Sequence, residues 1–60
     1  MMKHYYYDYG FVSRKLLIEL LGREEIQDFC KRADEALEKN MSRETYSEKI
    51  YGHDVTVRRK

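Results

Sequence analysis

The chain has 60 residues, with twelve Lys and Arg against eleven Asp and Glu, and 42% hydrophobic residues that include six tyrosines. This length allows one domain, residues 1–60, with a thin core, and the near balance of charge argues against a disordered chain. Its single cysteine excludes an intrachain disulfide, and its isolated histidines lack the paired spacing of a zinc site, so we expect no metal and no cofactor.

Residues 3–9 are rich in tyrosine, which favours β-strands, and we predict a strand that ends at Gly10. Side chains alternate along a strand, so one face carries Tyr5, Tyr7 and Tyr9, and the other carries His4, Tyr6 and Asp8. A small sheet with helices on one side cannot bury both faces of this strand. One of the two sets must therefore face solvent or a partner.

Two helices are predicted next. Ser13 is a suitable N-cap for a helix over residues 14–21, and Gly22 is a suitable C-terminal cap. A second helix over residues 24–39 carries apolar residues at the spacing of one helical face. These residues are Ile26, Phe29, Cys30, Ala33, Ala36 and Leu37. We expect Cys30 to be a buried, unreactive member of this stripe.

The last third of the chain, residues 43–59, predicts a β-hairpin whose two-residue turn is Gly52-His53. That turn pairs Ile50 with Val55. It gathers one apolar face from Tyr46, Ile50, Val55 and Val57, opposite a wet face of Ser47, Lys49, Thr56 and Arg58. The alternative is a third helix over residues 42–51, capped by Ser42. The hairpin gives an α+β domain in β-α-α-β-β order, with two helices on a small antiparallel sheet.

The order strand, helix, helix over residues 3–40 resembles that of ribbon-helix-helix repressors, dimeric proteins whose paired strands enter the DNA major groove. The strand here offers tyrosines and Asp8 where basic and polar side chains are expected. A helix-turn-helix centred on Gly22 would need an aliphatic residue where the chain has Asp28, on an acidic second helix. Neither DNA-binding architecture is therefore predicted.

Catalytic motifs are missing from the sequence: it contains no nucleophile elbow, phosphate-binding glycine loop or HExxH pattern. A chain this short also leaves little volume for a substrate pocket. We therefore expect a protein that is not an enzyme and has no small-molecule substrate. No run approaches the roughly 18 apolar residues of a membrane span, so we expect no membrane-spanning segment. A single cysteine fits a reducing environment, so we expect a cytoplasmic protein.

Two functions remain. The first is a small interaction module that binds and regulates or inhibits a partner protein, or forms a homodimer, through the tyrosine-rich strand. Its candidate residues are Tyr5, Tyr6, Tyr7 and Tyr9, because tyrosine brings large amphipathic area at low entropic cost. The second is a small DNA- or RNA-binding regulator. Its candidate residues are Lys49, Arg58, Arg59 and Lys60.

Overall fold

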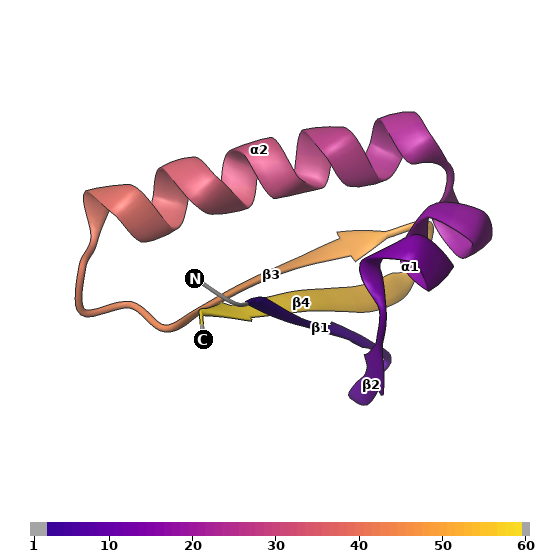
Figure 1. Ribbon diagram of the computed structural model, residues 1–60, viewed down its shortest axis with the longest axis horizontal. Coiled ribbons are helices and arrows are strands. Elements are labelled where there is room, and N and C mark those ends of the chain that lie inside the picture. The colour runs from indigo at the N-terminus through magenta and orange to yellow at the C-terminus, as the bar shows by residue number, and fades with distance from the viewer. Residues whose placement is uncertain (1–2, 60) are drawn as a thin grey trace.

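A computed structural model describes residues 3–59, which fold in the order β-β-α-α-β-β (Figure 1). The elements are β1 (Lys3–Tyr7), β2 (Gly10–Val12), α1 (Arg14–Leu21), α2 (Arg23–Lys39), β3 (Thr45–Ile50) and β4 (His53–Arg59). The predicted α+β class, two helices with an antiparallel sheet and a C-terminal hairpin, is confirmed. The strand β2 was not predicted, and because two strands precede the helices, the element order no longer resembles that of ribbon-helix-helix repressors.

The N-terminal strand is shorter than predicted, because the chain reverses after Tyr7. Asp8 and Tyr9 have φ of +49° and +71°, and Tyr7 pairs with Gly10 across this two-residue turn. Hairpin turns with two positive φ angles are usually marked by Asn-Gly or Asp-Gly. Asp tolerates the left-handed region but Tyr rarely adopts it, so Asp8-Tyr9 is not recognisable as a turn, and the predicted strand end at Gly10 is wrong.

The C-terminal hairpin turns one residue earlier than predicted, at Tyr51-Gly52, with φ of +52° and +82°. Ile50 therefore pairs with His53, and Tyr46 pairs with Val57. This pairing differs from the predicted one by two residues. Because side chains alternate with a period of two, the shift leaves every residue on its predicted face. The third-helix alternative for residues 42–51 is wrong, since β3 occupies most of that segment.

The sheet has the order β2-β1-β4-β3, with every neighbouring pair antiparallel. Both helices lie on one side of it (Figure 1). The Ser13 hydroxyl accepts a hydrogen bond from the Leu16 backbone at 3.1 Å, which begins α1 as predicted. Gly22, at φ +102°, ends α1 and lets α2 start at the next residue. The far side of the sheet carries no element of the described chain.

The core lies between the sheet and the helices. It consists of Leu17, Leu21, Ile26, Phe29, Ala33, Ile50, Val55 and Val57. Within residues 3–59, no polar or charged residue is buried. Cys30 is only half-buried, at the margin of this core, rather than buried as predicted. No helix of the described chain is long and apolar enough to cross a membrane.

The chain has two phenylalanines in opposite environments, which allows a matched test of the fold. Phe29 is 0% exposed and Phe11 is 68% exposed. We expect Phe29→Ala to lower the free energy of unfolding by about 3–5 kcal/mol, because it opens a cavity in a thin core. Phe11→Ala should cost less than about 1 kcal/mol. Urea unfolding followed by circular dichroism measures both, and equal losses would contradict this packing.

Candidate interaction surface

The pairing of β1 divides the four candidate tyrosines. Tyr5 pairs with Val57 and Tyr7 pairs with Val55, and both tyrosines pack against the core. The Tyr5 hydroxyl lies 3.9 Å from the Cys30 thiol, and burial raises the pKa of Tyr5 to about 12. These two side chains therefore support the helices from below and are only partly accessible to a partner.

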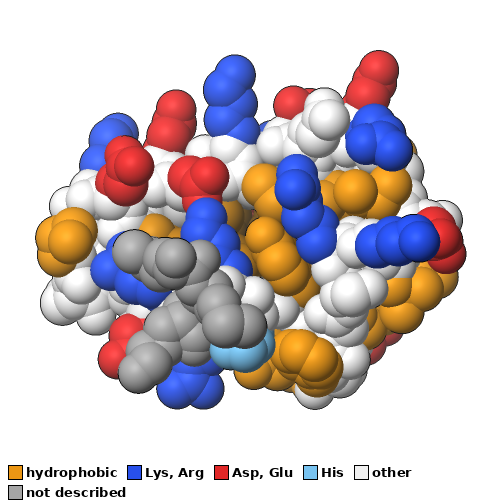
Figure 2. All heavy atoms as spheres, in the orientation of Figure 1, with side chains coloured by type: hydrophobic (Ala, Val, Ile, Leu, Met, Phe, Trp, Pro, Cys, Tyr) orange, Lys and Arg blue, Asp and Glu red, His pale blue; other side chains and the backbone are white. Residues whose placement is uncertain are grey.

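Tyr6 belongs to the opposite face of the sheet, where it pairs with Phe11 of β2. Their ring centroids are 5.9 Å apart in an edge-to-face arrangement, and the His4 ring lies 5.7 Å from Phe11. We call these three residues the aromatic cluster. Figure 2 shows hydrophobic side chains beside a histidine at the lower edge of the molecule, where β2 lies in Figure 1. Phe11 is largely exposed beside Tyr6, and packing in the core does not account for this pair of rings because both lie on the face opposite the helices.

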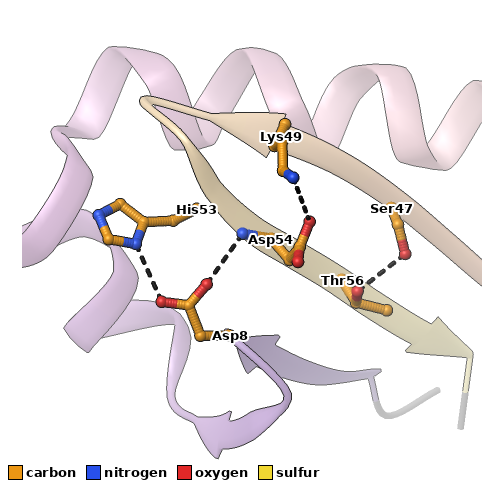
Figure 3. Close-up of polar contacts among 6 residues, drawn as sticks. All are labelled: Asp8, Ser47, Lys49, His53, Asp54 and Thr56. Carbon is orange, nitrogen blue, oxygen red and sulfur yellow. Dashed lines mark hydrogen bonds and ion pairs between the residues drawn. The ribbon is translucent and has the colours of Figure 1, made fainter.

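The other residues on this side of the sheet are polar. We call the whole sheet surface that faces away from the helices the open face. Besides the aromatic cluster it carries Thr45, Ser47, Lys49, Asp54, Thr56 and Arg58. The Ser47 and Thr56 hydroxyls are 2.8 Å apart, and the Lys49 ammonium lies 3.8 Å from an Asp54 carboxylate oxygen (Figure 3). The open face therefore combines rings, hydroxyls and both signs of charge.

The two hairpin turns meet at one end of the sheet through Asp8 (Figure 3). One carboxylate oxygen of Asp8 lies 2.9 Å from Nδ1 of His53, and the other accepts the backbone N–H of Asp54 at 3.0 Å. The hydrogen bond with His53 is the largest influence that lowers the pKa of Asp8. The His53 ring also stacks on Tyr7, with centroids 4.9 Å apart. These contacts join the turns to each other.

A histidine beside a carboxylate is also a general-base arrangement, and here the pair lies at the surface of the molecule. Both side chains are about half exposed, at 44% for His53 and 48% for Asp8. A cavity of about 310 Å³ lies elsewhere, along the C-terminal half of α2. Its lining residues are Lys3, Asp34, Leu37, Glu38, Met41 and Arg59. The histidine and the cavity are therefore separate features.

The basic residues predicted to bind nucleic acid do not form one patch. Lys49 and Arg58 lie on the open face, and Arg58 is 3.8 Å from Glu44. Arg59 instead reaches α2, where its guanidinium donates to the backbone carbonyls of Leu37 and Met41. Lys60 lies outside the described residues. Two of the four predicted cations therefore share the open face with Tyr6.

Tyr9, the fourth candidate tyrosine, stands in the β1–β2 turn and is 85% exposed. A hydrogen bond between its hydroxyl and Asp54 raises the pKa of Tyr9. Tyr9 is therefore accessible at the end of the open face. Phe11 is not among the predicted site residues, because its proximity to Tyr6 depends on the N-terminal hairpin. His4 shares the predicted strand face of Tyr6 but is not among the predicted site residues either.

No known protein family matches the chain, and no curated protein or solved structure matches it significantly. Function must therefore be inferred from the chemistry of this chain's own surfaces.

The junction of the two turns makes a testable prediction about pH. Because the pKa of Asp8 lies below its ordinary value of 3.8, its contribution to stability is complete above that value and is lost as the pH falls through the folded-state pKa. We expect His53→Ala to raise the Asp8 pKa towards 3.8 in an NMR titration, whereas His4→Ala should leave it unchanged. An Asp8 pKa unaffected by His53→Ala would show that this hydrogen bond is not formed in solution.

Proposed function

We propose that this chain is a small, non-enzymatic protein-interaction module that binds a partner protein, or a second copy of itself, through the open face. The observation that carries this proposal is the exposure of Phe11 beside Tyr6 on a sheet surface that no helix of the described residues covers. Aromatic side chains are enriched at the centres of protein interfaces, where they bury large area at low entropic cost. Occupying a partner's surface is also the simplest way for such a module to regulate or inhibit it.

The local scaffold favours an anchoring role. Tyr6 lies on β1, which is paired on both sides, so its backbone is fixed before any partner arrives. Preorganised anchors lose less conformational entropy on binding than mobile ones. The neighbouring hydroxyls of Ser47 and Thr56 supply the polar groups typical of an interface margin.

The balance of charge favours a protein over a nucleic acid. Phosphate binding needs several cations without opposing carboxylates. On the open face, Lys49 lies near Asp54 and Arg58 lies near Glu44, each at 3.8 Å. Arg59 is held against α2. Of the predicted cations within residues 3–59, Lys49 and Arg58 remain on this surface, and both have acidic neighbours.

Nucleic acid is nevertheless the second candidate, because the fold puts Lys49 and Arg58 on the same surface as the Tyr6 ring, where a base could stack. Fluorescence anisotropy with single-stranded and duplex DNA at low salt tests it, since the electrostatic attraction is strongest there. We expect no binding. Binding that weakens with salt and is lost in Lys49→Ala and Arg58→Ala would replace the protein-interaction proposal.

Site-specific photo-crosslinking tests the protein-interaction proposal in the cells that produce the chain. A benzophenone amino acid in place of Phe11 should yield discrete protein adducts upon illumination. The matched control carries the same group in place of Tyr51, which is 70% exposed but lies in the other hairpin turn. Circular dichroism verifies that both variants fold.

The result that supports the proposal is an adduct at position 11 that is absent at position 51, and that is reduced when Tyr6 is also changed to Ser. Equal adducts at both positions would indicate random collision. An absence of adducts at position 11 would overturn the proposal.

A further inference from the structure

We propose that the open face binds the open face of a second copy of this chain, forming a symmetric dimer in which Arg58 of each copy meets Asp54 of the other. This inference rests on the proposed function and names its partner. The argument depends on the order of charges along β4, on the register of the sheet and on the area available.

Charge along the open-face positions of β4 changes sign from one end of the strand to the other. Alternation along β4 places Arg58, Thr56 and Asp54 in succession on this face. Tyr6 pairs with Thr56 and Phe11 pairs with Tyr6, so these two rings lie at the level of the neutral middle position, whereas His4 lies level with Arg58. Along β4 the face thus runs from basic through neutral to acidic, and Lys49 of β3 lies beside the acidic position.

Such an arrangement is complementary to itself under one particular rotation. A twofold axis that lies in the interface, perpendicular to the strands and at the level of Tyr6 and Thr56, places Arg58 of one copy over Asp54 of the other. Arg58 then faces Asp54 twice, once from each copy, and the Tyr6 and Phe11 rings of the two copies come together at the centre. This is the isologous contact expected of a twofold dimer. A twofold axis parallel to the strands would instead bring the Arg58 residues of both copies to one level and the Asp54 residues to another.

The existing ion pairs of these residues do not oppose this contact. Arg58 and Glu44 are 3.8 Å apart, as are Lys49 and Asp54, and all four groups are partly or largely exposed. Exposed pairs of this kind contribute little to stability. Arg58 can therefore leave Glu44 at small cost, and because each carboxylate oxygen has two lone pairs, Asp54 can accept from the incoming guanidinium as well as from its present neighbours.

The dimensions of the molecule limit the area that the dimer can bury, and therefore its affinity. Its two longest extents, 29 and 21 Å, limit the open face to at most roughly 600 Å² per copy, so the dimer buries no more than about 1,200 Å² in total. That upper bound lies at the lower limit of specific interfaces. We therefore expect a weak dimer that dissociates on dilution, held by the rings and given its orientation by the two charge pairs.

Charge reversal provides the test. Arg58→Glu puts two acidic residues opposite each other at both ends of the dimer, and Asp54→Lys puts two basic residues there. We expect each variant alone to associate at least about tenfold more weakly than the natural chain. An equimolar mixture of the two should regain the natural affinity, because each mixed dimer again pairs opposite charges at both ends.

Analytical ultracentrifugation from about 1 µM to about 1 mM measures the mass against the 7.4 kDa of one chain. Restoration in the mixture supports the dimer and cannot arise from misfolded variants. Lys31→Glu is the matched control, because Lys31 is exposed on α2, on the other side of the sheet, so association should change less than about threefold.

A natural chain that stays monomeric to 1 mM, or a mixture that stays as weak as its components, would overturn the dimer. Photo-crosslinking at position 11 separates the two levels of the argument. An adduct with a different protein from a monomeric chain leaves the interaction module standing and rejects self-association. An absence of any protein adduct rejects both.

Discussion

The pairing of β1 with β4 is the constraint on which the rest of the structure depends. It joins the two ends of the described chain, with Lys3 opposite Arg59, and it forms the centre of the sheet. It also fixes which tyrosines support the helices, because Tyr5 and Tyr7 oppose valines of the core face. A slip of one residue would exchange the two faces of β1 and put Tyr6 under the helices. The composition of both surfaces therefore follows from this one register.

Contacts at the margins hold the register and the helix layer. Asp8 bridges the turns at one end of the sheet. On the helix side, the Arg32 guanidinium makes two hydrogen bonds to the Glu48 carboxylate, at 2.6 and 2.8 Å, and this contact lowers the pKa of Glu48. That bidentate pair ties α2 to β3, the edge strand. Such polar contacts give a thin core directional restraints that apolar packing alone does not provide.

The two surfaces of the sheet differ in composition, which is why we assign the proposed function to the open face. The helices pack against the valines, Ile50 and three tyrosines (Tyr5, Tyr7 and Tyr46), which cover the apolar residues of one sheet surface. On the other surface, Tyr6 and Phe11 have no covering element in the described chain. Arg58 and Asp54 give β4 charges of both signs on this surface. Such a surface suits a partner that also carries both signs of charge better than it suits a polyanion.

Local patterns in the sequence were sufficient for the helices, with Ser13 and Gly22 at their boundaries, and for the faces of the C-terminal hairpin, because helix caps and strand alternation are short-range effects. They failed at Asp8-Tyr9, where tertiary contacts hold a tyrosine at positive φ. The tertiary structure alone decided which tyrosines face outward and that Phe11, Tyr6 and Arg58 share a surface. The reason is physical: β1 pairs with a strand about fifty residues away, and no short-range preference specifies such a register.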